Sequence, residues 1–430
     1  MSIEPKRFLE DLFEKAIAAA HPAVCLPPLL PEPPASGRLI LLAAGKAAGS
    51  MIEAAERYYL ETKRVPRERL AGIAVARHGY GRPTQVIDMI EAGHPVPDEA
   101  SLNSATRALE LAASATADDL VLVLMSGGAS ANWIAPASGL ALAEKQAVTR
   151  ALLRSGANIG EINTVRKHLS RIKGGRLARA ASPARLVTLA ISDVPGDDPD
   201  TIGSGPTVPD RSTLADARAV VARFKLDLPE SVHRALNDPA NESPKPGDPI
   251  FKTAQFHLAA RPADAFEAAQ ASIRAAGYEC IFLGANLEGE ARDVANEQAA
   301  MAKKLQAERR RAVILSGGEL TVTIRGKGRG GPNQEYALAL ALALDGTTGI
   351  YALAGDTDGT DGGAGSAEDP AGARVDGHTA ARARALGLDP AAFLADNNST
   401  GFFGPLGDLL TPGPTFTNVN DFRAILIDRP

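Results

Sequence analysis

Aromatic residues and cysteines are both scarce in this chain of 430 residues. Aromatic side chains make up 4% of the residues, so alanine and leucine must supply most of the core, which favours helices packed closely on sheets. The two cysteines, Cys25 and Cys280, are too few for a disulfide framework, and their separation fits no metal site. We therefore expect a protein of the reducing cytoplasm.

The chain also lacks an excess of positive charge, long apolar runs and clustered histidines. Its formal net charge of -5 argues against a general nucleic-acid surface, although a local basic cluster could still bind a small anion. The longest strongly apolar stretch, Ala337 to Leu344, is far shorter than the roughly 20 residues of a membrane-spanning helix. Acidic residues in the N-terminal helix argue against a secretion signal, and the histidines show no zinc-ligand spacing. We expect no nucleic-acid or membrane partner, while the sequence leaves the oligomeric state open.

What the sequence does contain is an alternation of strand, turn and helix. This alternation is typical of α/β domains in which helices cover a parallel sheet. The length exceeds the usual size of one core, and the pattern stops near residue 236, in a segment rich in Pro, Asn, Asp and Lys. We predict one α/β domain at 36–235 and a second at 236–430, on which the N-terminal helical segment 1–30 can pack.

Short apolar stretches mark the predicted strands, and longer amphipathic stretches mark the helices. In the first half we predict strands at 38–44, 120–125 and 186–191. In the second half we predict strands at 257–260, 278–283, 312–315, 320–324 and 350–353, and helices at 263–276 and 290–306. Ligands of open α/β sheets lie beyond the carboxyl ends of strands, so the turns at these ends are the candidate site.

Two of these turns carry groups suited to an anion. Lys46 follows the first predicted strand and opens a helix, where an anionic ligand would relieve its unfavourable interaction with the helix dipole. The second predicted strand ends in a turn with unhindered backbone N–H groups and two hydroxyls, formed by Ser126, Gly127, Gly128, Ala129 and Ser130. Such a turn can hold a phosphate or a carboxylate. An exposed lysine and a plain tight turn are the alternatives.

A basic set of residues follows in the first half. A helical spacing of three and four relates Asn163, Arg166 or Lys167, Ser170 and Lys173. This basic face, with Lys167 and Lys173, predicts a cationic wall for a polyphosphate. Basic residues also commonly end a helix before glycine, and that interpretation remains open.

Two acidic loops complete the candidate groups. Asp193 and Asp198 follow the strand at 186–191 and could bind Mg²⁺, which takes one or two protein oxygens and keeps most of its waters. An acidic surface turn is the alternative. The second loop, residues 355–363, contains Asp356 and also follows a predicted strand.

The segment 325–334, with the sequence RGKGRGGPNQ, is predicted to be an anion-handling loop. Its glycines match the dinucleotide-binding pattern G-x-G-x-x-G, so a nicotinamide site is an alternative. However, Pro332 suits the first position of a helix, which leaves Gly331 outside that helix. The loop also carries three cations, more than a pyrophosphate needs. A transferring phosphoryl group or a carboxylate fits this loop better.

The full set of motifs runs in a characteristic order along the chain: AAGKAAG at 43–49, MSGGASA at 125–131, EINTVRKHLSRIKGGRLA at 161–178, ISDVPGDD at 191–198, GSGPTVPD at 203–210, LSGGELTVTIRGKGRGGPNQEYALALAL at 315–342 and GDTDGTDG at 355–362. As a set they cover nearly the whole chain and resemble the class II glycerate kinases. The resemblance implies phosphorylation of D-glycerate by ATP with Mg²⁺, usually at the 2-hydroxyl. It also implies a Rossmann-like N-terminal domain and a leucine-rich C-terminal domain around a cleft that holds the active site.

The resemblance gives each candidate residue an expected role. The lysine and arginine that correspond to Lys46 and Arg325 are held to be active-site residues in this family, and we expect both to hold glycerate and to neutralise the transferred phosphoryl group. Asp193 is expected to orient the reacting hydroxyl, with Asp356 as its rival. We expect the remaining contacts to come from Asn333 and Asp356 for glycerate, from Ser126, Gly127, Gly128, Ser130, Lys167 and Lys173 for ATP, and from Asp193 and Asp198 for Mg²⁺.

Two departures from the family pattern leave the substrate preference open. Members commonly have arginine where this chain has Pro332, and the second acidic loop continues into an unusual tail at 363–370. Relatives have also been labelled hydroxypyruvate reductases, an activity that would need a nicotinamide site. A non-catalytic sensor of sugar acids or nucleotides is a further alternative.

Overall fold

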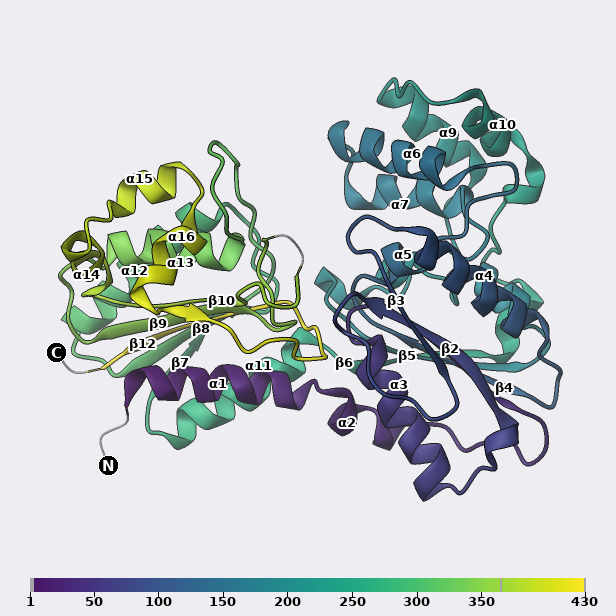
Figure 1. Ribbon diagram of the computed structural model, residues 1–430, viewed down its shortest axis with the longest axis horizontal. Helices are drawn as coiled ribbons and strands as arrows, with labels where there is room; N and C mark the ends of the chain where they lie inside the picture. Colours follow the sequence, from purple (N-terminus) through teal and green to yellow (C-terminus); the bar gives the residue numbers. More distant parts are fainter. Residues whose placement is uncertain (1–3, 364–365, 429–430) are drawn as a thin grey trace. The chain divides into compact units, whose positions relative to one another are not determined.

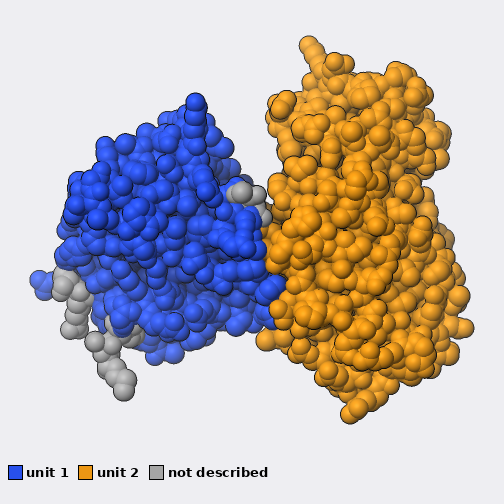
Figure 2. Space-filling view, in the orientation of Figure 1, with its two compact units in different colours: residues 1–21, 260–430 blue, residues 22–259 orange. Residues whose placement is uncertain are grey.

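The computed structural model describes residues 4–363 and 366–428, and the chain forms two compact units (Figure 2). Unit 1 contains the chain up to His21 and from Ala260 onward, and unit 2 contains Pro22 to Ala259. The segment 236–259 groups with the first half of the chain, whereas the predicted boundary placed it in the second domain. The N-terminal helix groups with the second half.

Unit 2 contains a Rossmann-like sheet. Five of its six strands, β3, β2, β1, β4 and β5, pair in parallel, and β6 extends the sheet beyond β5. The chain fills positions to one side of β1 before β4 starts the other side, so the strand order reverses between β1 and β4. The strands are β1 (Leu39–Ala44), β2 (Leu70–Arg77), β3 (Asp88–Ala92), β4 (Leu120–Met125), β5 (Arg185–Ile191) and β6 (Ala254–Ala260).

The helices of unit 2 cover this sheet and build a separate helical group. In α4, Ala105, Ala108 and Ala112 recur at helical spacing and share an apolar cluster with Ile73 and Val75 of β2, so small side chains bring the helix close to the sheet. Helices α6, α7, α9 and α10 share an apolar core of their own (Figure 1). The helices are α2 (Pro22–Cys25), α3 (Ala48–Arg57), α4 (Glu99–Ala113), α5 (Ala129–Asn132), α6 (Leu142–Arg154), α7 (Ile159–His168), α8 (Arg176–Ala181), α9 (Leu214–Arg223) and α10 (Glu230–Asn237).

Unit 1 contains a mixed sheet in the order β11-β10-β9-β12-β8-β7. Strands β7 and β8 are parallel, and the other neighbouring pairs are antiparallel. Every residue of β12 is buried between its neighbours. The strands are β7 (Glu279–Phe282), β8 (Ala312–Gly317), β9 (Ile350–Asp356), β10 (Gly372–Asp376), β11 (Leu409–Leu410) and β12 (Asp421–Ile427).

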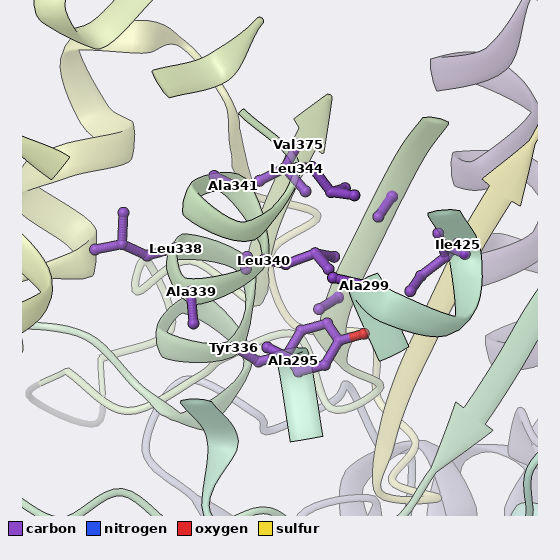
Figure 3. Close-up of a cluster of buried hydrophobic side chains, with 14 of the residues drawn as sticks. Ala295, Ala299, Tyr336, Leu338, Ala339, Leu340, Ala341, Leu344, Val375 and Ile425 are labelled. Atoms are coloured by element: carbon purple, nitrogen blue, oxygen red, sulfur yellow. The ribbon is translucent and has the colours of Figure 1, made fainter. Parts of the chain in front are cut away.

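Helices lie on both faces of the unit 1 sheet, with α1 and α11 on one face and α12 and α13 on the other (Figure 1). Beyond its polar first turn, helix α13 is apolar and buried on all sides, and Figure 3 shows Leu338 and Leu340 on opposite sides of the helix. The helices are α1 (Pro5–Ala19), α11 (Pro262–Ala275), α12 (Ala291–Ala307), α13 (Pro332–Ala343), α14 (Thr379–Ala385), α15 (Pro390–Ala395) and α16 (Ser399–Leu406). The predicted class, two α/β domains with a Rossmann-like first domain, is confirmed. Across the described ranges, no helix has the length and apolarity to span a membrane.

One predicted strand, at residues 320–324, is wrong. This segment forms a single isolated bridge, between Thr321 and Glu290, and joins neither sheet. The carboxylate of Glu290 accepts hydrogen bonds from the backbone N–H and the hydroxyl of Thr323, each at 3.0 Å, so a side chain satisfies groups that a neighbouring strand would otherwise satisfy. In the unusual tail at 363–370, positions 364 and 365 lie outside the described residues.

Candidate functional site

In unit 2, the turns that follow β1 and β4 interlock where the strand order reverses. The backbone N–H of Lys46 donates to the carbonyl oxygen of Gly127 at 2.7 Å. The N–H of Ala47 donates to the hydroxyl oxygen of Ser126 at 2.9 Å, and the N–H of Ala48 donates to Gly45 at 3.1 Å. The N–H groups of the turn before α3, that of its first residue Ala48 and the buried hydroxyl of Ser126 are therefore engaged within the protein. The predicted contact of Ser126 with a nucleotide remains a prediction.

The turn after β4 brings Lys46 and His94 together at Gly128. Gly128 has a left-handed φ of 84°, and a Cβ atom added there would lie 3.0 Å from the His94 ring and 3.3 Å from Cγ of Lys46. Both side chains therefore lie against this glycine. The close approach, together with the positive φ, explains why a side chain cannot be accommodated at position 128.

His94, which lies two residues after the end of β3, was missed by sequence reasoning. The strand itself was not predicted, because the charged Asp88 and Glu91 interrupt its apolar character. The loop is held at both ends, because Asp98 accepts a hydrogen bond of 2.9 Å from the N–H of Gly93 and also caps α4. Because the strand before it was not recognised, no local signal pointed to His94.

Lys173 and Ser130 meet next to the same turn. The Lys173 ammonium donates to the carbonyl oxygen of Ser130 at 2.9 Å, and the Ser130 hydroxyl lies 2.8 Å from the hydroxyl of Ser204. Asn163 lies beside Ser204, at 3.4 Å. The predicted helical face running from residue 163 to 173 is wrong, because α7 ends at His168 and Lys173 follows in a turn. Asn163 and Lys173 nevertheless converge through the two serines.

Lys173 belongs to a buried cationic cluster with Lys145 and Arg166. The side chains of Lys145 and Lys173 are 2% and 3% exposed, and the Lys145 ammonium donates to the carbonyl oxygen of Arg166 at 2.8 Å. Burial and the neighbouring Arg166 lower the pKa of Lys173 to about 7, and burial with repulsion from Lys173 lowers that of Lys145. Among the described residues, no carboxylate forms an ion pair with these three cations. The cluster therefore favours an anionic ligand.

Lys167 has a different environment from that of Lys173. It is buried and forms ion pairs with Asp200 and with Asp210, at 3.4 Å in the second case. A phosphate would have to compete with two carboxylates for this ammonium. The geometry gives Lys167 a structural role, and its predicted contact with ATP remains a prediction.

The predicted metal ligands lie in the loop after β5. Asp193 is half-buried, and Asp198 is exposed with one carboxylate oxygen accepting the N–H of Asp200 at 3.0 Å. Over the described part of the chain, no three His, Cys, Asp or Glu side chains are grouped so that they could hold a metal ion. The donors at this loop are all oxygens, which Mg²⁺ prefers, and most of its coordination would come from phosphate oxygens and water.

In unit 1, the glycine-rich loop packs tightly against the segment 396–398, between α15 and α16. A Cβ atom added at Gly326 or Gly328 would lie within 2.3 Å of Asp396 or Asn398. The N–H groups of the loop donate to the same segment, as when Gly328 donates to the Asp396 carbonyl at 2.9 Å. These glycines are therefore explained by packing, and the anion-handling capacity of the loop depends on its exposed side chains, Arg325, Lys327 and Arg329.

The N-terminus of α13, which follows this loop, is occupied by a carboxylate of the protein. Asp361 accepts hydrogen bonds from the backbone N–H groups of Asn333, at 3.0 Å, and Gln334, at 2.8 Å. A dinucleotide site would need these donors for its pyrophosphate. Asp361 therefore closes the position at which the G-x-G-x-x-G pattern would place that group.

Asn333 joins two buried carboxylates. Its side-chain nitrogen lies 3.2 Å from Asp361 and 2.7 Å from Asp421. Burial and the neighbouring Asp421 raise the pKa of Asp361 to about 7. Asn333 is 1% exposed, and its side-chain oxygen has no hydrogen-bond partner among the described residues. Asp356 is half-buried at the end of β9, where it accepts the N–H of Asp358 at 2.9 Å.

Comparison with known proteins gives consistent matches over the whole chain. Residues 8–237 match the family described as Domain of unknown function (DUF4147), and residues 312–421 match the MOFRL family. A D-glycerate 2-kinase of Thermotoga maritima is 39% identical, covering 98% of this chain and 98% of the relative. A protein of Agrobacterium vitis with the provisional name hydroxypyruvate reductase is 47% identical, covering 99% of this chain and 95% of the relative. The crystal structure of a glycerate kinase from Thermotoga maritima matches with a TM-score of 0.85 at 39% identity, covering 98% of this chain and 99% of that chain.

The fold and these matches define a class: two-unit α/β proteins with a Rossmann-like unit and a MOFRL region. Within that class, the chain belongs to the class II glycerate kinase family.

Proposed function

We propose that the protein transfers the γ-phosphoryl group of ATP to the 2-hydroxyl of D-glycerate, giving 2-phosphoglycerate and ADP. The observation that carries this proposal is the buried cationic cluster of Lys145, Arg166 and Lys173, which lies next to Ser130 and among the described residues has no carboxylate to balance it. A polyphosphate would bring that balancing charge. The family membership supports the same activity.

ATP is assigned to unit 2. Lys173 would bind a phosphate oxygen together with the hydroxyl of Ser130 and the N–H groups of Gly127 and Gly128. Helix α5 has only four residues, so its dipole contributes little and the side-chain cations must supply most of the attraction. The predicted contacts of Ser126 and Lys167 with ATP are weaker candidates, because both side chains already have partners within the protein.

The residues that the family resemblance implies for glycerate are Lys46 in unit 2 and Arg325 and Asn333 in unit 1. Each cation, considered within its own unit, would attract the glycerate carboxylate or the transferred phosphoryl group. The orphaned side-chain oxygen of Asn333 could accept a hydrogen bond from a glycerate hydroxyl, which supports a polar contact there. Asp356, beside the same network, is the remaining predicted contact.

The reaction forms a bond between the 2-oxygen of glycerate and the γ-phosphorus, and it breaks the bond from that phosphorus to the β-bridging oxygen. The hydroxyl proton passes to a carboxylate, for which Asp193 is our candidate and Asp356 its rival. Since phosphoryl transfer depends mainly on positioning and electrostatics, this carboxylate need not be a strong base. Mg²⁺, held through Asp193 or Asp198, would neutralise charge on the phosphates.

A hydroxypyruvate reductase is the second candidate, because the Agrobacterium vitis relative carries that provisional name. A reductase needs a helix N-terminus open to the pyrophosphate of its nicotinamide cofactor. The N–H groups of Asn333 and Gln334, in the first turn of α13, donate to Asp361. The helix that follows the G-x-G-x-x-G pattern therefore does not offer these donors, which favours the kinase.

The proposal is tested by incubating the protein with ATP, Mg²⁺ and D-glycerate and recording a phosphorus NMR spectrum. We expect the resonance of 2-phosphoglycerate. The 3-phosphoglycerate resonance would instead contradict the proposed regiochemistry. A parallel incubation with NADH and hydroxypyruvate should leave the nicotinamide absorbance constant, and steady oxidation would overturn the kinase assignment. A sensor would bind ATP or glycerate in calorimetry yet release no ADP.

A further inference from the structure

Asn397 holds the backbone at Arg325. Its side-chain oxygen accepts hydrogen bonds from the N–H groups of Arg325, at 2.7 Å, and Gly326, at 3.0 Å. Its side-chain nitrogen donates to the Glu335 carboxylate at 3.0 Å. One amide therefore connects the glycine-rich loop to the first turn of α13.

Glu335 ties Asn397 to a rigid framework. It is 2% exposed and accepts a hydrogen bond of 2.6 Å from Arg292 of α12. Arg292 also donates to the carbonyl oxygen of Leu394 in α15, at 2.6 Å. Three helices thus fix the position of Glu335, and through it the orientation of the Asn397 amide.

The backbone of Asn397 restricts which residue can act here. Its φ of 52° lies in the left-handed region, which glycine and asparagine adopt at low cost. Glycine would fit the backbone but would remove the amide. Asparagine provides the amide and also tolerates the left-handed backbone. The substitution Asn397→Gly keeps this backbone and therefore measures the contribution of the side chain.

Arg325 depends on such support. It is exposed, the segment before it joins neither sheet, and its side chain has no ion-pair partner among the described residues. The neighbouring contacts from Asp396 and Asn398 hold Lys327, Gly328 and Arg329. The side chain of Asn397 therefore fixes the backbone of Arg325, from which the arginine side chain extends.

We propose that Asn397 is a positioning residue for the reaction, acting through Arg325. This inference rests on the proposed function, in which the Arg325 guanidinium binds glycerate and the transferred phosphoryl group. Asn397 does not touch the substrate. It keeps the arginine backbone in one place, so the guanidinium loses less conformational freedom when it binds.

The test measures kcat and KM of purified variants together with their thermal unfolding midpoints. We expect Asn397→Gly to lower kcat by about 10- to 100-fold, because small misplacements of a reacting group have effects of this order. The KM for ATP and the unfolding midpoint should change little. Asn398→Ala, which removes the contact to Arg329 only, is the matched control and should have a much smaller effect.

Two further comparisons separate positioning from general structural damage. In an Arg325→Ala background, Asn397→Gly should cause no additional loss, since the residue acts through the arginine. Asn397→Asp places a carboxylate against Glu335 and should lower kcat. When Glu335→Gln is added, the glutamine amide can donate to the new carboxylate at position 397, so the hydrogen bond between the two side chains forms again with donor and acceptor exchanged. The double variant Asn397→Asp with Glu335→Gln should therefore recover most of the lost turnover.

The outcomes distinguish this inference from the proposed function. If the wild type makes no phosphoglycerate, the proposed function fails and the inference fails with it. If the wild type is active but Asn397→Gly leaves kcat unchanged, or lowers it equally with and without Arg325, only the inference is overturned. Failure of the double variant to recover turnover, while it still unfolds at the wild-type temperature, would also overturn it.

Discussion

The ammonium group of Lys173 donates a hydrogen bond of 2.9 Å to the carbonyl oxygen of Ser130. A carbonyl oxygen solvates this cation but does not neutralise it, and Arg166 adds repulsion. The pKa of Lys173 is lowered to about 7 by burial first and by Arg166 second, so near pH 7 the group is only partly protonated. An ATP phosphate would favour the protonated form.

ATP binding should therefore take up a proton. Above pH 7 the free amine is mainly neutral, whereas the bound phosphate raises its pKa, so affinity should fall as pH rises from about 7 to 9. Calorimetry at pH 8 in two buffers of different ionisation enthalpy measures this uptake. Lys173→Met should reduce the uptake, while the exposed Lys303→Met should leave it intact. Equal uptake in wild type and Lys173→Met would contradict the assignment.

Removing either of the two predicted active-site cations should impair turnover without unfolding the protein. We expect Lys46→Ala and Arg325→Ala each to lower kcat by on the order of 100- to 1,000-fold, because each removes a charge where negative charge develops. Arg325→Lys should recover only part of the loss, since lysine lacks the paired donors of the guanidinium. Near wild-type turnover in either alanine variant, measured by a coupled ADP assay, would exclude that residue.

The Mg²⁺ requirement should be sensitive to the loop after β5. EDTA should abolish turnover, and Asp193→Asn should raise the Mg²⁺ concentration needed for half-maximal rate. Asp198→Asn provides the comparison, because its carboxylate is exposed and already accepts the Asp200 N–H. A larger shift of this Mg²⁺ concentration in Asp198→Asn would identify Asp198 as the Mg²⁺ ligand instead. If the concentration shifts in neither variant, neither aspartate binds Mg²⁺.

His94 should contribute to the chemistry because its ring lies against Gly128 beside Lys46. We expect His94→Ala to lower kcat by about 10- to 100-fold, a range similar to the loss of one stabilising donor. His94→Gln retains a side-chain donor and should lose less. The exposed His257→Ala serves as the control. Steady-state kinetics in which His94→Ala matches this control would rule out the role.

Many elements of the fold could be predicted from local sequence, although strands β2 and β12 were not among them. Much of the site could not be predicted. The apolar strand at 120–125 and the glycine turn after it were found because their signals are local. Lys145 belongs to an ordinary amphipathic helix, and only the packing of α7 and the turn at Lys173 buries it. The contact between Asn397 and Arg325 joins residues 72 positions apart, and no local pattern encodes it. Lys173 was predicted for the wrong reason, since a turn rather than a helical face places it.

In unit 1, Asp361 should dominate the pH dependence of stability. Its pKa is raised from 3.8 to about 7 by burial first and by Asp421 second. Between these two pKa values the folded state holds a proton that the unfolded chain releases. The contribution of Asp361 to the free energy of unfolding should therefore be fully present below pH 3.8 and should be lost as the pH rises toward 7. One such group changes the free energy of unfolding by up to about 1.4 kcal/mol per pH unit within this window.

Urea unfolding between pH 5 and 8 checks this prediction. Asp361→Asn should flatten the slope, because it removes the titrating group while its side-chain oxygen can still accept one N–H of α13. The variant also loses one capping hydrogen bond, which can cost about 1 kcal/mol at every pH, so the slope and not the absolute stability is the decisive quantity. Glu297→Gln, at an exposed position of α12, should keep the wild-type slope. If Asp361→Asn shows the wild-type dependence of unfolding free energy on pH, another group holds the proton in the folded state. Asp421 is then the next group to test, because burial also raises its pKa.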